Sequence, residues 1–246
     1  MAGVSYFTYN GHKSTDFGLV ISNPVETNSG AQAAVEVVTI PGRAGALTIN
    51  SDRRDEIEIV YEVWGRAGYN EHRANFMRKI KAWLLQGQGK YFDLSDTYDP
   101  EYYWRARYVG DVVISQDYYR IVSMQLQFLA YPYKFSLEGN RTIHVTGDAL
   151  SNYSINNPEA FDSAPYFKII GRGDLALKVN GKVWRIKDVT QYVEMDCGQM
   201  NTYVGGVSYN DKKTGEGYPM LKPGNNTIVC SDTITALDIR PRWRTL

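Results

Sequence analysis

Apolar and polar residues alternate along much of this chain, and this pattern limits the folds open to it. In residues 56–64, for example, Ile57, Ile59, Tyr61 and Val63 fall on one face and the glutamates mostly on the other. A period of two is typical of a strand with one buried and one solvated face. The 22 glycines and 19 tyrosines also favour β-structure with many turns. We therefore expect a fold that is mainly β.

Helical periodicity is convincing in one segment, residues 71–85. Its apolar positions recur at spacings of three and four: Phe76, Met77, Ile80, Trp83 and Leu84. Asn70 is predicted to cap the start of this helix, and Gly87 or Gly89 to end it. Basic residues fill the opposite face, which we interpret as a solvated face on a helix that packs over a sheet. With a further alternating strand at 119–128, the pattern predicts an α+β layer arrangement.

Composition changes after Tyr131-Pro132-Tyr133, where Asn, Ser, Gly and Asp become frequent. Asn180-Gly181 between two alternating runs is a strong hairpin signal. Arg240, Arg242 and Arg244 are predicted to share one solvated face of a terminal strand. We predict two domains, an N-terminal β-rich (α+β) domain at 1–134 and an antiparallel β-sandwich at 135–246. The predicted strands of the sandwich are 166–170, 175–179, 183–186, 189–195, 201–208, 226–230 and 233–240.

Charge and hydropathy exclude several classes of function. Lys and Arg total 27, as do Asp and Glu, so no global field attracts nucleic acid or an anionic membrane. No run is long enough to span a membrane, and the first seven residues give no sign of a secretory signal. We expect no nucleic-acid specificity, no membrane insertion and synthesis in a reducing cytoplasm. Cys197 and Cys230 are expected to be free, buried thiols.

The sequence offers no evident chemical site. It lacks a Gly-x-Ser-x-Gly elbow, a phosphate-binding glycine loop and zinc-ligand cysteine spacing. His12, His72 and His144 are scattered and are interpreted as structural. One acidic group lacks the spacing of a helix-loop-helix calcium site and is interpreted as a solvated loop: Asp93, Asp96, Asp99 and Glu101. We therefore predict no catalytic residue, cofactor or metal ligand. A glycosidase that uses these carboxylates is kept as an alternative, behind the two non-enzymatic functions given below.

An aromatic-rich stretch follows the acidic group. It could pack on a sheet, stack on sugar rings or form a protein interface, where Tyr and Trp are frequent anchors. Of the functional alternatives, the protein interface is favoured. The residues are Tyr98, Tyr102, Tyr103, Trp104 and Tyr108.

A tight turn, Ile40-Pro41-Gly42-Arg43-Ala44-Gly45, separates two strand-like runs. Proline presets φ for position i+1 of a turn, and glycine supplies the positive φ of position i+2 in a type II turn. The turn is either an ordinary hairpin turn with a solvated arginine or an element that shapes an assembly. Pro41, Gly42, Arg43 and Gly45 are our candidate architectural or interface residues.

The order of these features resembles the distal tail protein (Dit) family of siphophages, the bacteriophages with long, non-contractile tails. The resemblance covers essentially the whole chain in one order. The motifs that carry it are Phe7-x-Tyr9-Asn10-Gly11, Ser14-x-Asp16-Phe17-Gly18-Leu19, the turn at 40–45, Ala82-Trp83-Leu84, Tyr102-Tyr103, Tyr131-Pro132-Tyr133, Ser163-Ala164-Pro165, Gly171, Asn180-Gly181, Pro219 and 221–226.

The resemblance implies a structural role in the virion tail tip. The N-terminal domain would be the belt of a homohexameric ring, and the C-terminal domain a galectin-like β-sandwich that projects outward. The ring would be a hub at the distal end of the tail tube. Its partners would be the major tail tube protein, the tail-tip (tail-associated lysin or hub) protein and, in some phages, a receptor-binding protein of the baseplate.

Sugar binding does not follow from a galectin-like fold. The His-x-Asn-Pro-Arg pattern of a galectin site is missing, so Trp184 and Trp243 are expected to be core or interface residues. A carbohydrate-binding module that recognises host cell-wall glycans is the alternative to the structural hub.

Overall fold

The computed structural model divides into two compact units, Met1–Lys134 together with Leu246 (unit 1) and Phe135–Thr245 (unit 2). Strands make up 52% of the chain, and the one α-helix among the described residues is α1 (Arg73–Leu85). The predicted fold class, mainly β with one helix, is confirmed. The structure describes residues 4–23, 33–39, 41–42, 44–45, 47–69, 71–87, 89–110, 113–118 and 121–246.

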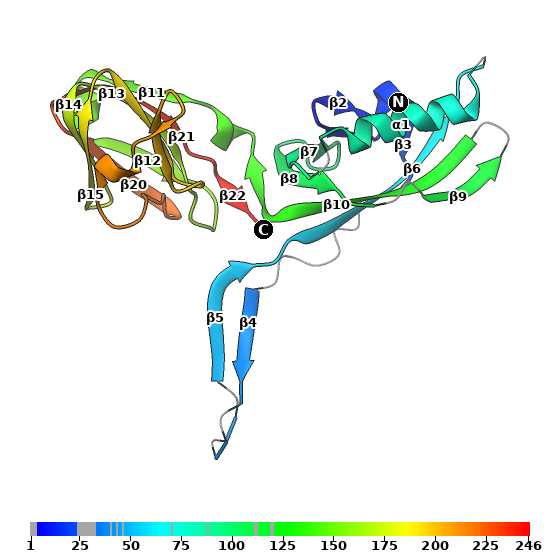
Figure 1. Ribbon diagram of the computed structural model, residues 1–246, viewed down its shortest axis with the longest axis horizontal. Helices are drawn as coiled ribbons and strands as arrows, with labels where there is room; N and C mark the ends of the chain where they lie inside the picture. Colours follow the sequence, from blue (N-terminus) through cyan, green and yellow to red (C-terminus); the bar gives the residue numbers. More distant parts are fainter. Residues whose placement is uncertain are drawn as a thin grey trace. The chain divides into compact units, whose positions relative to one another are not determined.

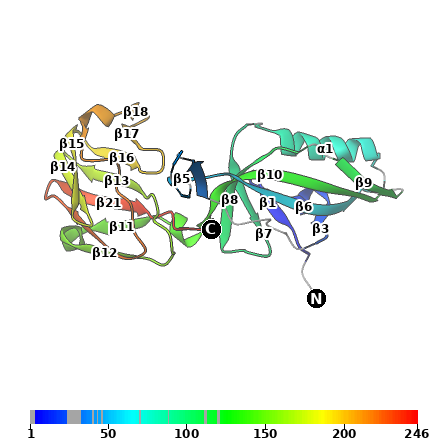
Figure 2. The ribbon, with the colours of Figure 1, turned by 90° about the horizontal axis from the view of Figure 1, so that it is seen from below.

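Unit 1 is built on a curved antiparallel sheet with the strand order β2-β1-β7-β8-β10-β6-β3, and β9 also pairs with β10 (Figures 1 and 2). β10 runs antiparallel to β6 from Ile121 opposite Arg66 to Ala130 opposite Ile57. β10 is longer than predicted, because the alternation of buried and exposed side chains continues past the predicted end at 128. The elements are β1 (Phe7–Tyr9), β2 (His12–Lys13), the 3-10 turn η1 (Ser14–Phe17), β3 (Leu19–Ile21), β4 (Ala33–Val38), β5 (Leu47–Arg54), β6 (Ile57–Arg66), α1, β7 (Phe92–Asp96), β8 (Tyr102–Tyr108), β9 (Val113–Tyr118) and β10 (Ile121–Ser136).

The apolar stripe of α1 packs onto this sheet, as the sequence predicted. Trp83 stacks on Phe17 with ring centroids 4.3 Å apart, and its Nε1 donates a hydrogen bond to the Tyr9 carbonyl at 3.1 Å. The helix begins at Arg73, two residues later than predicted, with His72 at the N-cap and no side-chain capping bond. Asn70, the predicted cap, lies outside the described residues.

Unit 2 consists of two antiparallel sheets, with the strand orders β11-β21-β13-β16-β17-β18 and β12-β20-β14-β15-β19. Both sheets contribute alternate residues to one buried core, which makes the unit a β-sandwich. Its strands are β11 (Ile143–Thr146), β12 (Tyr153–Asn157), β13 (Tyr166–Gly171), β14 (Gly173–Val179), β15 (Lys182–Val189), β16 (Tyr192–Asp196), β17 (Asn201–Val204), β18 (Val207–Ser208), β19 (Lys213–Thr214), β20 (Gly224–Cys230), β21 (Ile234–Arg240) and β22 (Arg244–Thr245), with 3-10 turns η2 (Glu138–Asn140), η3 (Gly147–Ser151) and η4 (Asn210–Lys212).

Two local predictions in unit 2 are confirmed. Asn180 and Gly181 have φ values of 49° and 85° and connect β14 to β15, as expected of a two-residue hairpin turn with positive φ at both positions. Cys197 and Cys230 are free and buried.

Two other predictions in unit 2 are wrong. Residues 201–208 are not one strand, because the chain reverses at Gly205-Gly206 to form the β17–β18 hairpin. The three C-terminal arginines do not share a solvated face. Arg242 has a φ of 55°, which breaks the alternation, and its guanidinium contacts both carboxylate oxygens of the buried Asp196 at 2.7 and 3.0 Å.

Candidate functional site

Three of the four acidic residues that sequence analysis tested against calcium make structural contacts. Asp93 pairs with Arg105 at 2.9 Å, and Asp99 pairs with Lys134 at 2.7 Å. Asp96 is buried and accepts three hydrogen bonds. Within the described residues, no group of three or more His, Cys, Asp or Glu side chains could hold a metal ion, and no helix there is long and apolar enough to span a membrane.

The β4–β5 hairpin is the most distinctive element of unit 1. β4 and β5 pair antiparallel from Val38 opposite Leu47 to Ala33 opposite Arg54, and together they form a two-stranded sheet of their own. An isolated two-stranded hairpin is at best marginally stable in water, because it has no third layer to bury its side chains. Such an element is suited to bind another surface.

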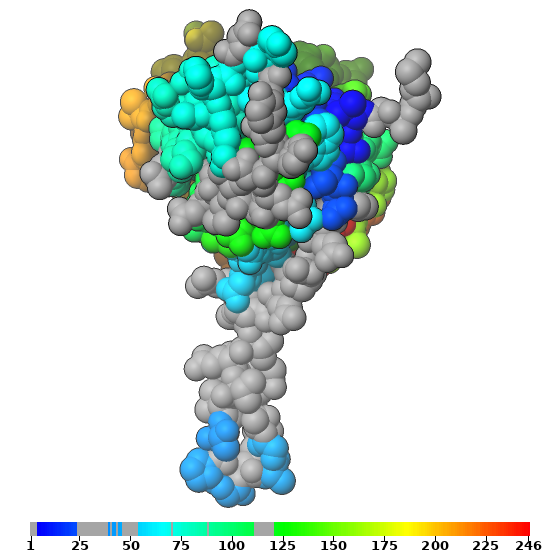
Figure 3. Space-filling view, turned by 90° about the vertical axis from the view of Figure 1, so that its right-hand side faces the viewer, coloured from blue at the N-terminus to red at the C-terminus, as the bar shows by residue number. Residues whose placement is uncertain are grey.

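The predicted turn lies at the end of this hairpin that points away from the sheet of unit 1 (Figures 1 and 3). Pro41 is exposed, and Gly42 has a φ of 84°, as position i+2 of a type II turn requires. Gly45 also has a positive φ, of 87°, and a Cβ added at either glycine would meet no atom within 4 Å. The glycines therefore serve backbone conformation. Arg43 lies outside the described residues.

The other end of the hairpin is fastened to unit 1 by a group of charged and aromatic side chains. Glu56, just after β5, forms an ion pair with Arg107 of β8 at 3.7 Å and accepts a short hydrogen bond from the Tyr91 hydroxyl. The Nε of Arg107 donates to the same hydroxyl at 3.2 Å, and the Tyr91 ring packs on Tyr131 of β10 with centroids 4.4 Å apart. Arg54 lies over the ring of Tyr133 at 6.0 Å. We call Glu56, Tyr91, Arg107 and Tyr131 the base cluster.

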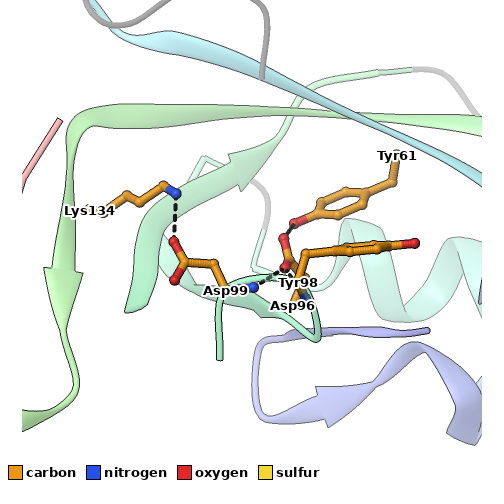
Figure 4. A network of polar contacts seen from close by, with 5 residues as sticks. All are labelled: Tyr61, Asp96, Tyr98, Asp99 and Lys134. Atoms are coloured by element: carbon orange, nitrogen blue, oxygen red, sulfur yellow. Dashed lines mark hydrogen bonds and ion pairs between the residues drawn. The ribbon is translucent and has the colours of Figure 1, made fainter. Parts of the chain in front are cut away.

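A second polar network lies deeper in unit 1 and ends at Lys134, the last residue before unit 2 begins (Figure 4). The Tyr61 hydroxyl donates to Oδ2 of Asp96 at 2.8 Å. Oδ1 of Asp96 accepts the backbone N–H groups of Tyr98 and Asp99 at 2.9 and 3.1 Å, which fixes the turn after β7. Asp99 in turn holds Lys134.

This network places a carboxylate and a tyrosine hydroxyl together in the interior of unit 1. Asp96 is 7% exposed, and Tyr61 is fully buried beside it. Burial, and then the charge and hydrogen bond of Asp96, raise the pKa of Tyr61 well above its ordinary value. Tyr61 therefore stays protonated and acts as a donor to the carboxylate over the physiological pH range.

Most of the predicted aromatic patch is packing. Tyr103, Trp104 and Tyr108 are buried in unit 1, whereas Tyr98 is 47% exposed. The tryptophans of unit 2 are also buried. Trp184 donates its indole N–H to the carbonyls of Glu216 and Gly217, and Trp243 is 5% exposed. Neither presents a ring face on which a sugar could stack.

No protein-family model matches this chain, and no curated protein matches it. Among solved structures, the crystal structure of the Dit protein (gp 19.1) of SPP1 superposes on it with a TM-score of 0.71, covering 99% of this chain and 100% of that one. The chain has the Dit fold. Only 14% of the aligned residues are identical, so the backbone is shared while most side chains differ. SPP1 Dit is described as a paradigm of the hub adsorption apparatus in phages that infect Gram-positive bacteria.

The resemblance drawn from the ordered motifs is thus confirmed at the level of the fold. The base cluster is the feature that sequence analysis missed. Its members come from four separate segments, so no local pattern marks them. Tyr131 was quoted as part of a motif, but its stacking partner Tyr91 had no signal of its own.

Proposed function

We propose that this protein is a structural component of a siphophage adsorption apparatus, and that it forms a homohexameric hub at the distal end of the tail tube. The observation that carries the proposal is the likeness to the SPP1 Dit hub protein along the whole chain, both units included. Asp93, Asp96 and Asp99 make structural contacts, and this gives no support to a catalytic role.

The ring would be made by repetition of one contact. Identical subunits that meet head to tail use two different surfaces, and the ring closes only if these surfaces fix the rotation between neighbours. The β4–β5 hairpin fits this role, because its base is anchored by Glu56 and Arg107 while its strands pair only with each other among the described strands. At its tip, the guanidinium of Arg43 would bind a carboxylate or a backbone carbonyl on its own or the next subunit.

The remaining contacts follow from a ring at the end of a tube. One face of the ring of N-terminal belt domains would bind the major tail tube protein, and the other the tail-tip hub protein. Unit 2, the galectin-like sandwich, would extend outward and offer a site to a receptor-binding protein. Stacked rings are compatible with a net charge of zero, since little like-charge repulsion opposes assembly.

A shortened hairpin tests this proposal. Val35 lies opposite Asn50, so replacement of residues 36–49 by Asn-Gly keeps the register and closes the strands with a two-residue turn. Among the described strands, β4 and β5 pair only with each other and lie outside the large sheet of unit 1, so the melting of both units should not change. We expect the full chain to have the mass of a hexamer by light scattering and the shortened chain to have that of a monomer.

Two point variants refine the test. Arg43→Ala should weaken the hexamer if the guanidinium reaches a neighbour, whereas Lys90→Ala, at an exposed position before β7, should not. A shortened chain that still forms the full ring would overturn the role of the hairpin. A full chain that remains a monomer at high concentration, alone and with tail tubes, would contradict the hub.

A further inference from the structure

The outer face of the five-stranded sheet of unit 2 carries three cationic side chains that have no partner. Lys178 of β14 and Arg185 and Lys187 of β15 are exposed. None of them forms an ion pair, a hydrogen bond or a ring contact in unit 2, all of whose residues are described. Unpaired charge is gathered here although the chain as a whole is neutral.

Strand pairing places these three cations side by side. Lys178 lies opposite Val183, and Arg185 lies opposite Ala176, so the two cations are diagonal neighbours on the same face. Diagonal neighbours in an antiparallel pair are about 7–8 Å apart. Lys187 follows Arg185 by two residues and is also exposed, at the β-bulge where the register between β14 and β15 shifts. The three charges thus form one patch on a rigid hairpin.

The acidic residues of these two strands offset only part of the charge of the patch. Asp174 accepts the backbone N–H of Asp188 at 3.2 Å, and Asp188 pairs with Lys212 at 3.4 Å. Asp188 is thus balanced by Lys212, whereas Asp174 keeps its negative charge, so three positive charges face one negative charge.

The outer face of the six-stranded sheet provides a contrast. Its registers place His144 opposite Asp238, Asp238 opposite Lys168, and Lys168 opposite Glu194. Lys168 thus lies between two carboxylates, His144 contacts Asp238 at 2.5 Å, and Lys168 lies over the ring of Tyr192 at 4.8 Å. That face compensates its own charge, whereas the five-stranded face does not.

The side chains of the five-stranded face limit the classes of ligand that it can bind. Its exposed strand residues include no aromatic side chain, and protein interfaces depend on aromatic anchors and are poor in lysine. Single-stranded nucleic acids also bind by stacking on aromatic rings. Beside the cations, β12 and β20 present hydroxyl and amide groups, among them Ser154, Asn225 and Thr227, which can exchange hydrogen bonds with sugar hydroxyls.

We propose that the outer face of the five-stranded sheet binds an anionic polysaccharide, a sugar polymer that carries phosphate or carboxylate groups. Lys178, Arg185 and Lys187 bind the anionic groups, and the polar side chains of β12 and β20 contact the sugars. This binding differs from that of a galectin site, since it needs neither a stacking tryptophan nor the six-stranded face. It is independent of ring formation.

The test compares two charge reversals in the full chain. The double variant Lys178→Glu and Arg185→Glu removes the patch, and the double variant Lys81→Glu and Lys90→Glu makes the same change in net charge at two exposed positions of unit 1. Thermal melting confirms that each variant folds. The milder double variant Lys178→Gln and Arg185→Gln removes the charge without introducing repulsion and provides a second measure.

Binding is measured by biolayer interferometry on immobilised poly(glycerol phosphate) bearing sugars, polygalacturonate, neutral dextran and duplex DNA. The unaltered chain should bind one or both anionic polymers, and the pair of results identifies phosphate or carboxylate as the preferred group. The patch reversal should weaken binding at least tenfold, and the unit 1 reversal less than twofold. Binding should also fall as salt rises from 30 to 300 mM, because salt screens exposed charges. Equal binding to dextran, equal loss in both reversals, or tighter binding to duplex DNA than to either polymer would overturn the proposal.

Discussion

Tyr61 offers a direct test of how the interior of unit 1 is held together. Tyr61→Phe removes the hydroxyl that donates to Oδ2 of Asp96 at 2.8 Å. Asp96 is only 7% exposed, so its Oδ2 would lose this donor inside the protein. A hydrogen bond to a charged group contributes about 1.5–3 kcal/mol to stability. We therefore expect the free energy of unfolding of unit 1 to fall by about 2 kcal/mol at pH 7.

The same variant should change how stability depends on pH. The pKa of Tyr61 is raised in the folded protein, mainly by burial. Above about pH 10 the unfolded chain loses this proton while the folded chain keeps it, so stability falls with pH by up to about 1.4 kcal/mol per unit. A phenylalanine has no proton to lose. The difference in free energy of unfolding between the unaltered chain and Tyr61→Phe should therefore shrink from about 2 kcal/mol at pH 7 to near zero at about pH 11.5.

Calorimetry at pH 7, 9, 10 and 11, with the transition of unit 1 resolved, measures both effects. Tyr98→Phe is the matched control, because the Tyr98 ring is 47% exposed and only its backbone N–H contacts Asp96. The control should match the unaltered chain at every pH. A loss below about 0.5 kcal/mol for Tyr61→Phe, or a loss that is the same at pH 7 and pH 11, would refute this account of the network.

Three further predictions concern unit 2. Gly139→Ala places a Cβ 2.4 Å from the backbone nitrogen of Trp243, so unit 2 should lose about 3 kcal/mol in urea unfolding; an unchanged midpoint would contradict this packing. Arg242→Ala leaves the Asp196 carboxylate buried with only its backbone donors, so the loss should also be about 3 kcal/mol, and a loss near zero would mean that the pair contributes nothing. Burial raises the pKa of Cys230 to about 11, so its thiol should react with a disulfide reagent at pH 8 only after unfolding, and rapid labelling of the native protein would contradict the burial.

Local patterns predicted the elements whose burial alternates regularly. The pattern at 56–64 corresponds to β6, because side chains from Ile57 onward alternate between the core and the solvent. Asn180 and Gly181 formed their hairpin turn, since few other residue pairs accept positive φ at both positions. The helix was found for the same reason, although its start shifted from 71 to 73.

Contacts between segments that are distant in the sequence could not be predicted in this way. The base cluster joins Glu56, Tyr91, Arg107 and Tyr131, and their proximity depends on the order of strands in the sheet. Nothing local indicated that Arg242 would adopt a positive φ and turn toward Asp196. The cationic patch was equally hidden, because it arises only when β14 and β15 align.

The central claim is that this chain assembles as a six-fold hub. Electron microscopy of the purified full chain, alone and mixed with tail tubes, tests it most directly. We predict class averages of a closed ring with six-fold symmetry and a central channel, attached to one end of each tube. Isolated monomers in both samples, or rings of another symmetry that do not bind tubes, would contradict the account.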